Sequence, residues 1–180
     1  PMIELYVMSF CPYGVQMEEV MAPVIGLLKD SIDLRVRYIA SVEGDSIATA
    51  QSMHGSSEAV EDVRQLCIAK YASGSYWNYL AAFNTQCYPV WNNAERLAAC
   101  QQEVTTRLGI NGDTIDRCTA GQEGLELLRA DETMVGTRRV TSSPTLIING
   151  QVYSGARTPD AIKQAICGQF DVKPSACDIV

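Results

Sequence analysis

The sequence predicts an α/β fold, in which a central mixed sheet is flanked by helices and an all-helical domain is inserted between the strands. Strand patterns occur only near the two ends of the 180-residue chain, and helical periodicity fills the middle. A helical segment also follows the strand pattern at each end. We therefore assign residues 1–43 and 137–180 to the sheet domain and residues 44–136 to the inserted helical domain.

The N-terminal part predicts a strand, a helix and a second strand. Residues 2–8 form a short apolar run, which is typical of a buried strand. Apolar residues recur at helical spacing over 15–29, and Pro23 should kink this helix because proline removes a backbone donor. Residues 33–40 alternate as a strand does. A unit of this kind makes a right-handed parallel connection.

The middle of the chain shows helical patterns and no strand pattern. The expected helices cover residues 58–72, 76–86, 94–108, a short segment from the N-cap Asp113 to about Cys118, and 122–135. An aromatic cluster in the second of these helices forms either the core of the insertion or a peptide-binding groove. Its members are Tyr76, Trp77, Tyr79 and Phe83.

The C-terminal part returns to strands. Residues 145–148 and 151–153 flank Asn149-Gly150, the strongest two-residue signal for a β-hairpin. Thr158-Pro159 then supplies an N-cap and a first helical residue, which predicts a final helix.

Composition excludes several classes of function. The net charge of −7 argues against nucleic-acid binding, which needs basic patches. We expect no transmembrane segment, because no run of about 18 apolar residues occurs. No secretory signal is visible, and the opening Pro1-Met2 directly before a strand suggests a processed form.

The cysteines indicate an oxidising compartment. Seven are present, and we expect one reactive thiol and three structural bridges. The bridge-forming residues are Cys67, Cys87, Cys100, Cys118, Cys167 and Cys177. A local Cys167–Cys177 bridge is expected, and the pairing of the other four stays open. No structural metal site is expected, since His54 is the only histidine and no Cys-x-x-Cys occurs. The expected location is extracytoplasmic: periplasmic, secreted or lumenal.

The candidate active site is the stretch Ser9-Phe10-Cys11-Pro12-Tyr13-Gly14. It places Cys11 between the first strand and the first helix, where unpaired N–H groups and the helix dipole stabilise a thiolate. A thiolate is the nucleophile in thiol–disulfide exchange. Pro12 suits the first helical turn, where its missing N–H costs nothing.

This layout resembles the active site of the thioredoxin superfamily, whose usual motif is Cys-x-x-Cys. Gly14 stands where the second cysteine would be. The element order resembles the bacterial disulfide oxidoreductases of the DsbA-like kind, in which a helical domain interrupts a thioredoxin-like fold. Pro144 matches the superfamily's cis-proline, which lies against the reactive cysteine, and Ser143 precedes it.

The insertion resembles the gamma-interferon-inducible lysosomal thiol reductase (GILT) family. The family signature is Cys-Gln-His-Gly-x-x-Glu-Cys, and residues 52–59 keep its His-Gly-x-x-Glu centre. Cys67 follows at the family's spacing, whereas Ser52 and Ala59 replace the two flanking cysteines. The resemblance implies disulfide reduction in a lumenal or secreted setting. It does not extend to a two-cysteine cycle or to the lysosome.

These observations predict a thiol–disulfide oxidoreductase of reductase or isomerase type, in which Cys11 attacks protein or peptide disulfides. We expect Ser143 and Pro144 to hold the substrate backbone and Tyr13 to line the entrance. Because Gly14 cannot resolve the mixed disulfide, glutathione or another small thiol, a partner protein or a remote cysteine must do so. No other cofactor is expected.

Two other functions stay open. One is a redox-inactive peptide-binding or chaperone module that uses the same groove. The other is a glutathione-linked transferase, for which Arg138 and Arg139 would steer an anionic thiol rather than be simply solvated. His54 is expected to be a turn or capping residue, and a role as a base near Cys11 is the alternative.

Overall fold

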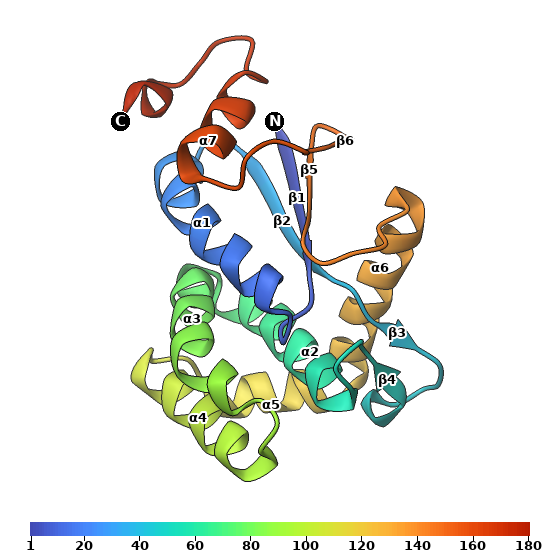
Figure 1. Ribbon diagram of the computed structural model, residues 1–180. Coiled ribbons are helices and arrows are strands. Elements are labelled where there is room, and N and C mark those ends of the chain that lie inside the picture. Colours follow the sequence, from blue (N-terminus) through green and yellow to red (C-terminus); the bar gives the residue numbers. More distant parts are fainter.

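Strand β1 (Met2–Val7) lies inside a four-stranded sheet in the computed structural model, which describes residues 1–180 (Figure 1). The strand order is β2-β1-β5-β6. Strand β2 (Asp33–Tyr38) runs parallel to β1, whereas β5 (Thr145–Ile148) is antiparallel to it. The hairpin expected around Asn149-Gly150 joins β5 to β6 (Gln151–Val152). The expected mixed sheet is therefore confirmed.

Helices cover both faces of this sheet. Helices α1 (Pro12–Leu28) and α7 (Pro159–Cys167) pack on the face that carries Ile3 and Leu5. Helix α6 (Gln122–Arg138) covers the opposite face, where Tyr6 meets its last turns (Figure 1). Pro23 lies inside α1 without ending the helix. As expected, Thr158 caps α7, its hydroxyl accepting from the Ala161 N–H at 3.2 Å.

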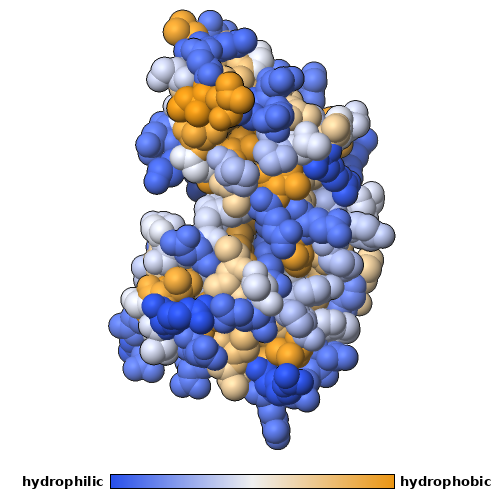
Figure 2. All heavy atoms as spheres, turned by 60° about the vertical axis from the view of Figure 1, so that its left-hand side comes forward, coloured by the Kyte–Doolittle hydropathy of each residue, from blue (hydrophilic) through white to orange (hydrophobic).

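The insertion contains four further helices, placed below the sheet in Figure 1. They are α2 (Ser56–Tyr71), α3 (Tyr76–Ala82), α4 (Ala94–Arg107) and α5 (Gly112–Ala120). Helix α3 continues as a π-helical turn over Phe83–Cys87. Figure 2 shows that the molecule narrows between the part with the sheet and the part with the insertion. The predicted boundary at 136/137 lies inside α6.

Two expectations about the insertion are wrong in detail. Strand β4 (Ala50–Gln51) lies within residues 44–136 and pairs antiparallel with β3 (Ser41–Val42), which precedes them, so the insertion contains one two-residue strand beside its helices. Strands of two residues are too short to show a periodic pattern. The N-cap of α5 is Asn111 rather than Asp113: the Asn111 side chain accepts from the Thr114 N–H at 3.2 Å. Asp113 lies in the first turn, where its charge suits the helix dipole.

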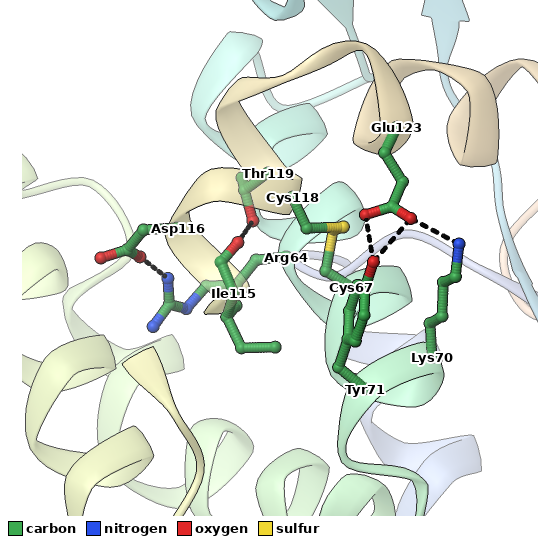
Figure 3. The surroundings of a disulfide bond; sticks show 9 residues. All are labelled: Arg64, Cys67, Lys70, Tyr71, Ile115, Asp116, Cys118, Thr119 and Glu123. Atoms are coloured by element: carbon green, nitrogen blue, oxygen red, sulfur yellow. Dashed lines mark hydrogen bonds and ion pairs between the residues drawn. A yellow bond between two sulfur atoms is a disulfide. The ribbon is translucent and has the colours of Figure 1, made fainter. Parts of the chain in front are cut away.

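Three disulfides join the elements. Cys67–Cys118 links α2 to α5 (Figure 3), Cys87–Cys100 links the π-helical turn to α4, and Cys167–Cys177 attaches the C-terminal tail to α7. Such bridges persist in oxidising surroundings, so they place the chain outside the reducing cytosol, in an extracytoplasmic or lumenal compartment. No helix of the structure is both long enough and apolar enough to cross a membrane.

Several carboxyl groups are buried in the core. Glu18 of α1 is 3% exposed, and burial raises its pKa to about 8 although the Asn84 amide donates to Glu18 Oε2 at 2.7 Å. Burial also raises the pKa of Glu61 to about 7 and that of Asp131 to about 6. The folded chain therefore keeps protons that the unfolded chain has lost between about pH 4.5 and 8, and its stability falls as the pH rises through this window.

We predict that Glu18→Gln removes much of this pH dependence. Glu18 should contribute a loss on the order of 3 kcal/mol between about pH 5 and 8, because only the folded state resists its ionisation. Urea unfolding of both proteins at the two pH values measures the difference. Asp30→Asn, at an exposed position just after the same helix, is the control and should leave the pH dependence of the unfolding free energy unchanged. An equal change of the unfolding free energy with pH in Glu18→Gln and in the parent chain would contradict the prediction.

The disulfides should differ in their contribution to stability. Cys67–Cys118 closes a separation of 51 residues, whereas Cys167–Cys177 closes one of 10. Chain entropy alone gives about 4 kcal/mol for the longer loop and about 3 kcal/mol for the shorter. Replacing both cysteines of a pair by alanine and measuring urea unfolding compares the two. If removing Cys167–Cys177 lowered the unfolding free energy more than removing Cys67–Cys118, the entropy of the unfolded chain would not determine which disulfide contributes more.

Candidate active site

Cys11 lies where β1 ends and α1 begins, and it is the free cysteine of the chain. It is the N-cap residue of α1, and Pro12 follows in the first turn. The backbone N–H groups of Tyr13 and Gly14 have no acceptor in the protein. Such unpaired N–H groups and the helix dipole give the N-terminus of α1 a partial positive charge. Cys11 itself is 8% exposed, while the neighbouring Tyr13 is 61% exposed.

The loop before β5 lies against the cysteine. The Ser143–Pro144 peptide bond is cis. The Cys11 thiol donates to the Ser143 carbonyl oxygen, with 3.6 Å between Sγ and O. The Ser143 hydroxyl accepts from the Met8 N–H at 3.0 Å. The structure thus brings together Cys11 and Ser143 from opposite ends of the chain.

Gly14 fits closely under Ser143. A Cβ atom at this position would lie 3.0 Å from Ser143 Oγ and 3.3 Å from the Met8 carbonyl oxygen. It would lie only 3.6 Å from the Cys11 Cβ. The Ser143 hydroxyl therefore occupies space that a larger residue at 14 would need. A side chain at position 14 and the Ser143 hydroxyl would therefore compete for the same space.

Helix α2 of the insertion holds the loop in front of the cysteine. The Ser9 N–H donates to Asp62 Oδ1 at 3.0 Å, and the Phe10 N–H donates to Glu58 Oε2 at 2.8 Å. The Ser9 hydroxyl also donates to the Glu58 carbonyl oxygen. Both carboxyl groups are fully buried, and burial raises the pKa of Asp62 well above its usual range, although the hydrogen bonds from Ser9 lower it. The second Asp62 oxygen has no partner.

His54 belongs to the same network. Its backbone N–H donates to Glu58 Oε1 at 2.9 Å, and its Nδ1 lies 2.8 Å from Glu58 Oε2. Its ring packs edge-on against Trp91, which in turn packs against Phe10 with 5.6 Å between ring centroids. Gly55 follows with φ of 103°, a conformation that favours glycine. These contacts fit the expected turn role of His54, and a role as a base near Cys11 stays a prediction.

Arg138 forms an ion pair with Glu4. Its Nη2 lies 3.0 Å from Glu4 Oε2 across the face of the sheet that α6 covers. Arg139 ends α6 in the left-handed conformation, with φ of 55°. The half-buried Arg138 is therefore paired within the protein, whereas Arg139 is exposed, and a role of either in guiding an anionic thiol stays a prediction.

Sequence reasoning missed two supporting residues, Asp62 and Trp91. Asp62 had a detectable signal, because Glu58 and Asp62 stand four residues apart and so occupy one face of a helix that is otherwise packed in the interior. Trp91 had none, since its contact with Phe10 depends on how two distant segments meet.

Comparison with known proteins finds one family and many structural neighbours. The family model described as the vacuolar sorting receptor thioredoxin-like domain matches residues 34–167, a range that begins after Cys11 and includes Ser143 and Pro144. Vacuolar-sorting receptor 1 of Pisum sativum is 31% identical over 137 residues, and vacuolar-sorting receptor 4 of Arabidopsis thaliana is also 31% identical. Each match covers 68% of this chain and 22% of the receptor, so the chain spans about a fifth of the length of these relatives.

The solved structures establish the fold. The reduced form of a disulfide bond oxidoreductase (DsbG) from Mycobacterium tuberculosis superposes with a TM-score of 0.66 at 17% identity, covering 98% of this chain and 81% of the other. Reduced DsbA from the same organism gives 0.64 at 17%, covering 98% and 85%. The chain thus has the expected thioredoxin-like, DsbA-like fold with a helical insertion. The matching family model is that of the sorting receptors, in place of the GILT family that the sequence had suggested.

We predict that residues 14 and 143 are energetically coupled. Gly14→Ala should gain helix propensity but push against the Ser143 hydroxyl, and Ser143→Ala should relieve that contact. A double-mutant cycle by urea unfolding should therefore show a favourable coupling of about 1 kcal/mol.

Gly26→Ala in the same helix is the matched control, because nothing lies within 4 Å of its added Cβ. It should stabilise the chain by about 0.5–1 kcal/mol and add independently to Ser143→Ala. Additive effects of Gly14→Ala and Ser143→Ala would show that the two positions are not coupled.

Proposed function

The chain belongs to the family of vacuolar sorting receptor thioredoxin-like domains, and we propose that it is a thiol–disulfide oxidoreductase that acts through the single thiol of Cys11. One observation carries the proposal. Cys11 is the one free cysteine, and it lies at an uncapped helix N-terminus facing the Ser143–Pro144 loop. The DsbA-like fold supports a redox role, since one of the structural neighbours named above, DsbG, is titled a disulfide bond oxidoreductase.

The reaction begins when the Cys11 thiolate attacks one sulfur of a protein or peptide disulfide. A mixed disulfide between Cys11 and the substrate forms, the substrate S–S bond breaks, and the second substrate sulfur leaves as a thiolate. Ser143 and Pro144 hold the substrate backbone beside the sulfur, and the exposed ring of Tyr13 contacts its side chains.

A small thiol such as glutathione completes the cycle. One molecule attacks the Cys11 sulfur and releases the reduced substrate, and a second regenerates the Cys11 thiolate and leaves as the oxidised dimer. The two electrons that reduce the substrate come from the two small thiols. Glycine at position 14 supports this route, because the motif contains no second thiol. The resemblance of residues 52–59 to the thiol reductase signature favours reduction as the direction.

A second candidate is a redox-inactive module that binds peptides on the surface around Cys11. The observation in its favour is that the family match begins at residue 34 and so does not include the cysteine motif. The relatives are moreover named as sorting receptors. In this case Cys11 would be dispensable for binding.

The test begins with the unreduced protein and alkylation by iodoacetamide, mapped by peptide mass spectrometry. We expect modification of Cys11 alone, because the other six cysteines are paired in disulfides. Glutathione-dependent reduction of insulin should fall at least a hundredfold in Cys11→Ser. Full activity of Cys11→Ser would disprove catalysis by this thiol and leave the binding module as the better account.

Restoring a second cysteine tests the coupling to Ser143. Gly14→Cys alone should form little internal disulfide, whereas Gly14→Cys together with Ser143→Ala should form one readily, because the alanine vacates the space beside residue 14. Thiol counting after mild oxidation measures this. Equal disulfide formation in the two variants would show that Ser143 does not control the site.

A further inference from the structure

Strand β2 forms an open edge of the sheet. It pairs only with β1, and the flanking hydrogen bonds from Asp33 N–H to the Pro1 carbonyl and from Ile39 N–H to the Val7 carbonyl fix its register. In a parallel ladder alternate residues bond to the same neighbour, so odd-numbered residues of β2 face β1. The N–H and C=O groups of Leu34 and Val36 therefore point away from the sheet.

These four backbone groups have no partner in the protein. The next group along the edge does have one: the Tyr38 N–H donates to Asp131 Oδ2 of α6 at 2.9 Å. Helix α6 thus occupies the outward-facing backbone donor at Tyr38, so an added strand cannot bond to it. The stretch from Leu34 to Val36 is left open, and it presents the repeating donors and acceptors that a further strand would bond.

A groove of about 490 Å³ lies along this open stretch. Its floor is β2 from Leu34 to Arg37, and its walls come from α2, α3 and α6. Apolar side chains on the three walls include Leu66, Trp77 and Leu127. Tyr76 and Trp77 of the aromatic cluster line this groove, whereas Tyr79 and Phe83 are buried in the core. The groove shares no residue with the Cys11 site.

The two sides of β2 differ in chemistry. Leu34 and Val36 lie on one face of the sheet, level with Ile3 and Leu5, and Arg35 and Arg37 lie on the other. A strand added beside β2 would place alternate side chains next to these two sets. The complementary strand therefore alternates apolar and acidic residues.

The charge of the groove agrees with this pattern. Three cations line it, Arg35, Arg37 and Lys70, against the single acid Asp131, in a chain whose net charge is −7. Arg37 pairs with Asp131 at 3.0 Å. Arg35 and Lys70 make ion pairs at the surface with Asp33 and Glu123, and such pairs contribute little and exchange readily with a ligand carboxylate.

We propose that the β2 edge is a peptide-binding site, which takes an extended segment of a protein partner with alternating apolar and acidic residues as a fifth strand of the sheet. The segment bonds to the free backbone groups of Leu34 and Val36, its apolar side chains enter the groove beside Trp77, and its carboxylates lie near Arg35. This site is independent of Cys11 and of the redox function proposed above.

The test uses a capped, fluorescein-labelled nonapeptide in which valine and glutamate alternate, with binding followed by fluorescence anisotropy. We expect saturable binding that Cys11→Ala leaves unchanged. Val36→Pro should weaken it at least tenfold, because proline removes an edge donor that makes no bond within the chain. Arg35→Glu should weaken it as well and should improve binding of the matching valine–lysine peptide. Arg96→Glu, at an exposed position on α4, is the charge control and should have no effect.

The backbone of the peptide provides a second test that leaves the protein intact. Two versions of the probe carry N-methyl groups either on every valine or on every glutamate. Only alternate N–H groups of a strand face a given neighbour, so one version should lose binding and the other should keep it. Absence of saturable binding by the parent chain, or equal binding of both methylated versions, would overturn the proposal. So would a self-associated chain that Val36→Pro converts to a monomer, because a second copy would then be the occupant.

Discussion

The backbone N–H groups of Ser9 and Phe10 are buried between two parts of the molecule, and they must find acceptors there. They find them in Asp62 and Glu58 of α2, a helix of the insertion. The residues immediately before Cys11 are therefore fixed by the insertion rather than by the sheet that supplies them. The Cys67–Cys118 bridge then ties the same helix to α5, so the residues before Cys11 are connected through α2 to a further helix of the insertion.

A second constraint is the space around Gly14. In a motif with two cysteines the fourth residue needs room for a side chain, and here the Ser143 hydroxyl takes that room while it binds the Met8 N–H. Gly14 and Ser143 thus fit together, because the glycine has no side chain and the serine hydroxyl lies beside it.

The insertion also decides which part of the sheet stays accessible. Helix α6 supplies Asp131, which bonds the Tyr38 N–H and pairs with Arg37, and so closes one end of the β2 edge. The remaining stretch at Leu34 and Val36 is bordered by the insertion without being bonded to it. One inserted domain therefore supports the cysteine loop at one place and leaves an open strand at another.

The sequence alone determined the mixed sheet, the inserted helices, the hairpin at Asn149-Gly150 and the position of Cys11 at a helix N-terminus, because each depends on periodicity or on turn chemistry within a few neighbouring residues. It also indicated three bridges, since one cysteine of the seven stands in the motif. Tertiary structure alone decided the pairing of Cys67 with Cys118, the two-residue strands β3 and β4, the binding of Arg138 to Glu4, and the contact of Ser143 with Gly14. Each of these joins residues whose approach is set by the packing of whole elements, and no local pattern along the chain records which distant side chains will meet.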